Sequence, residues 1–277
     1  MAYRTILVDC DASRAGPHRL GVATELARRF SAHLAGVHVR ARFEAPMFTD
    51  AGLAMDALYR AYEKDVRESE ATAQVRYTQA VAGKGLSSEW RVADGPADEA
   101  LAVQTRYADL VVLGQSDPDD VYALPDLPDT VALATGRPVL VVPHIGAARP
   151  PGSKVLLAWN ASRESARAAT DALPFLVKAG RVDVLVIDPV ESEGGHGPEP
   201  GADAATWLAR HGVKVTVHRD TAADSDVGAT ILSRAADLDS DLIVMGVYGH
   251  SRLREMVLGG ASRTLLQSMT VPVLMSH

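Results

Sequence analysis

The residues of this sequence whose types and spacing best suit chemistry are glycines that follow a short apolar run. The run at 241–246 ends in Gly246, and Gly249 and Gly259 follow with the spacing Gly246-x2-Gly249-x9-Gly259. Glycine permits positive φ and close backbone approach. A glycine-rich turn that leads into a helix leaves unpaired N–H groups that bind phosphate. The sequence therefore predicts an anion site here, with glycines that merely permit turns as the alternative.

The segment after Gly259 is predicted to begin a helix. Ala261-Ser-Arg-Thr-Leu-Leu-Gln has helix-forming periodicity, and Gly260 comes directly before it. Ser262 is expected either to cap this helix or to donate its hydroxyl to the anion. The predicted site thus combines backbone donors with a hydroxyl. The intervening segment is expected to add positive charge from His250, Arg252 and Arg254.

Strands that alternate with helices are predicted to position this site. Continuous apolar runs suit parallel strands that are buried on both faces, and helical spacing recurs between them, as at Ala166, Ala169 and Leu173. This alternation predicts an open parallel sheet with helices on both faces. Ligands of such sheets bind beyond the carboxyl ends of the strands, where the strand order reverses. The predicted strands of the second half are 154–159, 182–188, 213–218, 241–246 and 271–275.

Three segments of the first half recur in the second half in the same order. A repeat of this length predicts two tandem domains, at 1–147 and 152–277, joined by a Gly- and Pro-containing linker. The last apolar runs of the two domains, at 139–142 and 271–275, are each expected to form a sheet edge. The matching segments are 5–13 with 154–162, 108–114 with 240–246, and 137–144 with 271–277.

The composition of the 277 residues excludes several classes of protein. A net charge of −7 argues against a general nucleic-acid binder and against an anionic membrane surface as partner. The single cysteine, Cys10, lies in an apolar run and is interpreted as a core residue. The sequence has no signal-peptide pattern and no run long enough to span a bilayer, so we expect a cytoplasmic protein.

These motifs resemble those of the nucleotide-binding universal stress proteins. The Gly246-x2-Gly249-x9-Gly259 pattern is similar to their phosphate-binding motif, residues 157–162 are similar to their opening V-A-x-D-G-S, and Val-Pro-Val-Leu at 271–274 is typical of their last strand. The resemblance covers essentially the whole chain, twice. In the family the last strand pairs two domains, which implies that the edges at 139–142 and 271–275 pair within this chain and cover each other. It implies that each domain is a five-stranded, Rossmann-like α/β sheet of the adenine nucleotide alpha hydrolase-like type. It also implies ATP or another adenine nucleotide as ligand, with or without Mg²⁺.

By this resemblance, the nucleotide would bind to the C-terminal domain. Asn160 takes the place of the aspartate that contacts the nucleoside, and Ile187 would pack on the base. Two residues depart from the family pattern: Asn160 has no charge to help hold a cation, and Gly260 replaces a hydroxyl residue. No catalytic or metal-binding residue is predicted. The residues implied to bind nucleotide are Ala158, Asn160, Ile187, Gly246, Gly249, His250, Arg252, Gly259, Gly260 and Ser262.

The first domain is predicted to have lost its phosphate loop. Gly114 ends the matching strand, but prolines and aspartates follow it in place of the second and third glycines. Prolines lack N–H donors and aspartates repel phosphate. Asp11 and Ser13 keep the opening pattern, so the loss is partial. The aspartates are interpreted as a solvated acidic loop, with a cation site as the alternative, and they are Asp117, Asp119, Asp120, Asp126 and Asp129.

Three hypotheses of function follow from these observations. The first is a nucleotide-binding stress-response protein that acts as a sensing or regulatory module for a protein partner. The second is an interaction protein without nucleotide, in which the two domains form an intramolecular pseudo-dimer, alone or as a homodimer. The third is a slow ATP hydrolase, which is the least supported because the loop lacks a general base, a lysine and an acidic metal ligand.

Two further residue types have plain structural interpretations. The nine histidines are scattered, and neither His196 in the loop at 191–201 nor His218 after the third predicted strand belongs to a zinc-like cluster. Trp159, beside Asn160, is expected either to stack on a base or to pack in the core. The segment 53–82 has few helix breakers and predicts one long helix or a broken pair.

Overall fold

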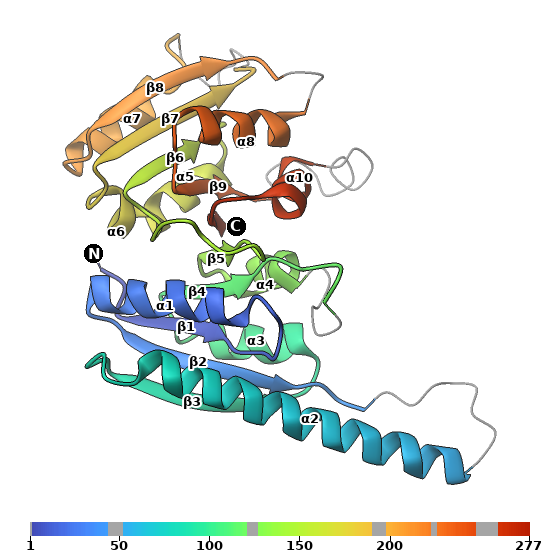
Figure 1. The fold of residues 1–277 in the computed structure, drawn as a ribbon. Coiled ribbons are helices and arrows are strands. Elements are labelled where there is room, and N and C mark those ends of the chain that lie inside the picture. Colours follow the sequence, from blue (N-terminus) through green and yellow to red (C-terminus); the bar gives the residue numbers. More distant parts are fainter. Residues whose placement is uncertain (1, 44–51, 121–126, 190–197, 223–225, 248–259) are drawn as a thin grey trace.

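The computed structural model of the chain has an α/β fold with two tandem domains (Figure 1). It describes residues 2–43, 52–120, 127–189, 198–222, 226–247 and 260–277. The first half contains β1 (Thr5–Asp9), α1 (Gly16–Phe30), β2 (His33–Arg40), α2 (Gly52–Val81), β3 (Ser88–Asp94), α3 (Ala97–Thr105), β4 (Leu110–Gly114), α4 (Leu127–Thr135) and β5 (Val139–Val142). The second half contains β6 (Lys154–Ala158), α5 (Arg163–Asp171), α6 (Leu173–Leu176), β7 (Arg181–Ile187), α7 (Ala202–Arg210), β8 (Val215–Asp220), α8 (Val227–Asp237), β9 (Leu242–Gly246), α10 (Ala261–Ser268) and β10 (Val273–Ser276).

The described strands form one continuous sheet in the order β3-β2-β1-β4-β5-β10-β9-β6-β7-β8. Within each half the strands are parallel, which confirms the predicted sheet type. The strand order reverses between β1 and β4 in the first half and between β6 and β9 in the second. Each half therefore has a switch point at which a ligand crevice is expected.

The two halves meet through their last strands. β5 and β10 pair antiparallel, with Val273 opposite Val141 and Met275 opposite Val139. This confirms the predicted pairing of the two apolar edges within one chain. All the residues of β5 and β10 are buried, so neither edge is left open to other chains.

Helices cover both faces of this sheet. Successive strand residues point to opposite faces, so a continuous apolar run presents apolar side chains to the helices on each face. On one face, Ile6 and Val8 of β1 belong to a core with residues of α1, α2, α5, α6 and α7. On the other face, Leu7 belongs to a core with residues of α3, α4, α8 and α10. The segment predicted as one long helix or a broken pair is the single helix α2, one half of which runs beyond the sheet (Figure 1).

Aromatic side chains also join the two halves. Tyr3, Phe30 and Phe175 contact one another edge-on, with ring centroids 5.0–5.6 Å apart. The Tyr3 hydroxyl donates to the carbonyl oxygen of Asp171 at 2.7 Å. The predicted domain limits, 1–147 and 152–277, stay a prediction. Among the residues that the structure describes, no helix is long and apolar enough to cross a membrane.

Gln115, directly after β4, provides a testable contact between the halves. Its side chain is buried, and Nε2 donates to the carbonyl oxygens of Leu266 and Gln267 at the end of α10, at 2.8 and 3.2 Å. Gln115→Leu removes the donor for these carbonyls, so we expect the free energy of unfolding to fall by about 1–2 kcal/mol in urea denaturation. The matched control is Gln74→Leu on the exposed face of α2. An equal loss in both variants would contradict a role for this contact.

Candidate functional site

The crevice at the β6/β9 switch point brings together half of the residues predicted to form a site. A cavity of about 110 Å³ there is lined by Ala158, Asn160, Ile187, Gly246 and Ser262. They come from the ends of β6, β7 and β9 and from the start of α10, as expected for a site at the carboxyl ends of the strands. The cavity is also lined by Trp159, Ser162, Glu164, Leu185, Val227, Ile231, Met245 and Ala261.

Four of the predicted site residues lie outside the described part of the chain. These are Gly249, His250, Arg252 and Gly259. Of the predicted glycine-rich loop, the structure therefore describes only the two ends. These are Gly246 at the end of β9 and Gly260 at the start of α10.

The start of α10 lines this cavity with Ala261 and Ser262. The helix begins at Ala261 as predicted. Of the two alternatives expected for Ser262, capping of the helix is contradicted, and donation of its hydroxyl to an anion stays a prediction. Gly260 adopts the extended N-cap conformation, so Ser262 is the second helical residue and makes no capping hydrogen bond. The N–H groups of Arg263 and Thr264 donate to the Gly260 carbonyl oxygen. The N–H groups of Ala261 and Ser262 belong to the first turn, where a helix has no internal acceptor for them.

The turn that follows β6 has an equivalent after β1 in the first domain. The Asn160 Oδ1 accepts the N–H of Ser162 at 3.2 Å, and the Asp11 Oδ1 accepts the N–H of Ser13 at 3.1 Å. Ser162 then caps α5 by accepting the N–H of Ser165 at 3.1 Å. Asparagine and aspartate oxygens can both accept this bond. Asn160 therefore keeps the geometry of the turn while removing its charge.

Glu164 is a cavity residue that the sequence reasoning missed. Its side chain is only 3% exposed, and it pairs with the exposed guanidinium of Arg163. Burial alone would raise the pKa of Glu164, but hydrogen bonds, chiefly from Arg163, hold it below its ordinary value. Glu164 thus brings a carboxylate, paired with Arg163, to the lining of the cavity. The preference for acidic residues in the first turn of a helix is the signal that could have suggested it.

The first domain has the larger cavity, although its phosphate loop was predicted to be lost. It measures about 270 Å³ and lies at the β1/β4 switch point, beside Asp9, Asp11 and Gly114. The guanidinium of Arg19, which also lines it, is buried and lies 2.7 Å from the Asp11 carboxylate and 3.4 Å from that of Asp9. Its Nε donates to the Asp9 carbonyl oxygen at 2.7 Å.

This buried ion pair sets the charge at the base of the first cavity. Burial raises the pKa of Asp9 to about 7 against the attraction of Arg19. Burial also acts to raise the pKa of Asp11, but Arg19 and the hydrogen bonds from Ser13 outweigh it and lower that pKa. Sequence reasoning missed Arg19, although it shares the buried face of α1 with Ala23, Leu26 and Phe30, where a cation needs a partner.

With this geometry in place, comparison with known proteins identifies the family. The universal stress protein family model matches residues 2–143 and 153–277. The chain belongs to the universal stress protein family. A search of curated proteins gave no significant match.

Two solved structures share the fold of this universal stress protein over nearly its whole length. A universal stress protein from Archaeoglobus fulgidus DSM 4304 is 17% identical, with a TM-score of 0.69, and the match covers 98% of this chain and 95% of that one. A putative universal stress protein from Pseudomonas aeruginosa UCBPP-PA14 is 18% identical, with a TM-score of 0.60, covering 99% and 93%. A universal stress protein solved in complex with cAMP is 22% identical over 51% of this chain and 98% of its own, with a TM-score of 0.33.

The aspartates after Gly114 of this universal stress protein do not form one solvated loop. Asp120 is buried and accepts the N–H of Arg14 at 2.6 Å, which holds the loop against the start of α1. Asp117 lines the cavity, and Asp119 is exposed. Asp126 lies outside the described residues, and no group of three or more His, Cys, Asp or Glu within them could hold a metal ion.

The remaining predictions have simple outcomes. Cys10 is a core residue as predicted, and burial raises the pKa of its thiol well above the ordinary value. Trp159 packs partly buried against the core while lining the second cavity. The prediction that His218 follows a strand is wrong: it lies within β8, and its Nε2 is 2.8 Å from Asp183. His196 lies outside the described residues.

Proposed function

We propose that the C-terminal domain of this universal stress protein binds an adenine nucleotide and that the bound nucleotide regulates contact with a protein partner. The observation that supports this proposal is the convergence of Asn160, Ile187, Gly246 and Ser262 on one cavity at the β6/β9 switch point. These residues come from separate parts of the chain. Their meeting at the place where such sheets bind ligands favours a binding site over glycines that only permit turns.

The chemistry of the cavity suits the parts of a nucleotide. Leu185, Ile187 and Met245 offer apolar contact for a base, while Asn160 and Ser262 offer an amide and a hydroxyl for a sugar or phosphate. The first-turn N–H groups of α10 suit a phosphate. The described cavity, at about 110 Å³, is smaller than the roughly 300–1,000 Å³ of typical ligand pockets. It therefore suits one end of a nucleotide.

The carboxylate of Glu164 sets an expectation about charge. Its negative charge opposes a bare triphosphate, so we expect AMP to bind at least as well as metal-free ATP. Mg²⁺ would neutralise part of the phosphate charge and is expected to strengthen ATP binding. The proposal assigns no chemical step to the site, and the rate of phosphate release from ATP is the measurement that checks this.

Isothermal titration of the full chain with AMP and with ATP tests the proposal. Ser262→Leu puts a bulky side chain into the cavity, so we expect the affinity to fall more than about tenfold, or ~1.4 kcal/mol. Ser268→Leu at the exposed end of the same helix is the control and should bind like the wild type. A folded wild-type protein that binds no adenine nucleotide at millimolar ligand would refute nucleotide binding.

A second candidate function is supported by the contacts between the halves. The antiparallel pairing of β5 with β10 and the packing of Tyr3, Phe30 and Phe175 make the chain a pseudo-dimer. Such a body could present a fixed surface to a partner without any nucleotide. The same titration separates the two candidates, because the scaffold requires no ligand for folding or partner binding.

A further inference from the structure

Helix α2 carries its apolar stripe beyond the sheet that it packs on. In the second half of the helix, Ala73 and Tyr77 are buried in the core. The same face continues at helical spacing through Val66 and Tyr62 to Met55. The first half of α2 projects past the sheet (Figure 1). An apolar face that extends past the core suits a contact with another molecule.

Aromatic contacts hold this projecting half of α2 in place. The ring of Phe43, after β2, packs on those of Tyr59 and Tyr62, with centroids 5.4 and 5.2 Å away. The Tyr62 hydroxyl donates to the carbonyl oxygen of Ala41. Tyr59 nevertheless stays 47% exposed, and Leu58 beside it is 41% exposed. The projecting half is therefore a preformed surface with two large apolar side chains open to solvent.

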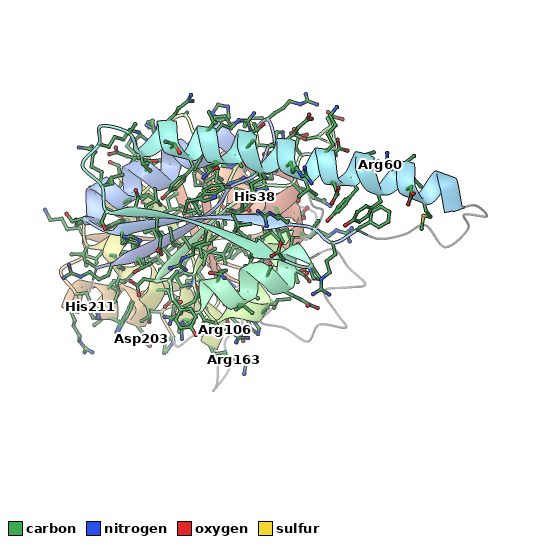
Figure 2. The ribbon with its side chains drawn as sticks, turned by 90° about the horizontal axis from the view of Figure 1, so that it is seen from below. His38, Arg60, Arg106, Arg163, Asp203 and His211 are labelled. Atoms are coloured by element: carbon green, nitrogen blue, oxygen red, sulfur yellow. The ribbon has the colours of Figure 1, made fainter. Side chains whose placement is uncertain are left out.

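A row of alternating charges borders this apolar surface. Asp56, Arg60, Glu63 and Arg67 are spaced by four, three and four residues, which places them along one edge of the helix. Figure 2 shows Arg60 on the part of α2 that projects beyond the sheet. Within the row, the Arg67 Nη2 lies 3.6 Å from the Glu63 Oε2, and both side chains are largely exposed. An exposed ion pair of this kind contributes little, so the row is free to pair with another charged surface.

The order of the signs selects a second copy of this chain as that surface. A two-fold axis brings the same patch of two copies together. When the two helices run antiparallel, the row of one copy meets the same row in reverse. The order negative, positive, negative, positive then meets its exact complement. Asp56 lies beside Arg67 of the other copy and Arg60 lies beside Glu63 of the other copy, and the axis repeats both pairs.

We propose that the chain forms a weak antiparallel dimer through the projecting half of α2, with Tyr59 and Tyr62 at its centre. The edges of β5 and β10 already cover each other, so a second copy has to dock elsewhere. The paired segment, 55–67, is about 20 Å long as a helix. An interface of this length lies at the small, transient end of specific interfaces. The inference goes beyond nucleotide binding by the C-terminal domain and does not depend on it.

Sedimentation equilibrium of the full chain at low ionic strength tests the proposal. Concentrations up to about 300 µM cover the weak association that so short an interface allows. We expect a monomer–dimer equilibrium with a dissociation constant on the order of 100 µM or below. Low ionic strength is used because exposed charge pairs are then least screened.

Charge reversal and charge exchange identify the contact. Arg60→Glu places like charges beside each other twice, so we expect dimerisation to weaken roughly tenfold. Adding Glu63→Arg to this variant restores opposite signs between the copies, and the dissociation constant should return to within about threefold of the wild type. Lys64→Glu is the matched control, because it makes the same change of charge on the face of α2 opposite Met55 and Tyr62. It should alter dimerisation less than about threefold.

Several results would overturn the proposal. The wild-type chain stays monomeric at about 300 µM, or Arg60→Glu dimerises as tightly as the wild type. The double variant stays as weak as Arg60→Glu, or Lys64→Glu weakens the dimer equally. Circular dichroism checks that each variant keeps its helices. Recovery of the dimer in the double variant cannot come from damage to the fold, so it supports pairing between copies directly.

Discussion

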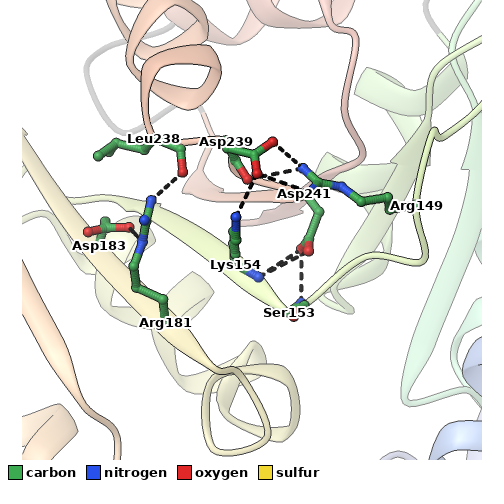
Figure 3. A network of polar contacts seen from close by, with 8 residues as sticks. All are labelled: Arg149, Ser153, Lys154, Arg181, Asp183, Leu238, Asp239 and Asp241. Atoms are coloured by element: carbon green, nitrogen blue, oxygen red, sulfur yellow. Dashed lines mark hydrogen bonds and ion pairs between the residues drawn. The ribbon is translucent and has the colours of Figure 1, made fainter.

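Replacing Asp241 with alanine is expected to lower the free energy of unfolding by about 3 kcal/mol. Asp241 is 4% exposed, and its Oδ1 accepts the N–H group of Gly152 at 2.7 Å. The same oxygen accepts the N–H groups of Ser153 and Lys154 at 2.9 and 3.1 Å (Figure 3). These residues lead the chain from the first half into β6. Alanine would leave three backbone donors without their charged acceptor, and each such loss is costly where water has little access.

The first domain provides a matched control for this prediction. Asp109 occupies the same place before β4, where its Oδ2 accepts the N–H groups of Arg4 and Thr5 at 2.7 and 3.0 Å. It accepts fewer bonds and is partly exposed, so Asp109→Ala should cost about 1–2 kcal/mol. Urea denaturation of both variants measures the difference. If both variants lose the same free energy of unfolding, the additional hydrogen bonds that Asp241 accepts before β6 do not contribute to stability.

The sequence predicted the features that depend on local pattern. Apolar runs located the strands of the second half to within about two residues, because a strand buried on both faces needs a continuous apolar run. The repeated Asp11 and Asn160 turns could be inferred because the side-chain oxygen and the N–H group that donates to it are two residues apart. Pairing of β5 with β10 followed from two matching apolar edges in one chain.

The features that sequence reasoning missed depend on contacts between distant segments. The first cavity is lined partly by α2, which packs against α1 and β2, and no local pattern encodes that it meets the ends of β1 and β4 there. Arg19 is stabilised by carboxylates ten and eight residues earlier, which only the packing of α1 on β1 brings close. The sequence lacks the glycine-rich loop after Gly114, but this did not show whether the cavity at the β1/β4 switch point is present.

Replacing Gly246 with alanine is expected to destabilise the protein by about 3 kcal/mol and to abolish ligand binding in the second domain. A Cβ on Gly246 would overlap the backbone carbon of Glu164 and lie 2.5 Å from the backbone nitrogen of Ser165. Backbone cannot move aside as a flexible side chain can, so β9 and the start of α5 would be forced apart. Both elements line the second cavity, so its shape would change with them.

Gly114, at the end of β4 in the first domain, shows why the two glycines differ. A Cβ there would meet the Nη1 of Arg19, the far end of a flexible side chain. Gly114→Ala should therefore cost less, about 1–2 kcal/mol, although it disturbs the ion pair of Arg19 with Asp11. Urea denaturation of the two variants, with nucleotide titration of each, compares them directly. If Gly246→Ala is as stable as Gly114→Ala and still binds ligand, close packing of β9 on α5 is not the reason for glycine at this position.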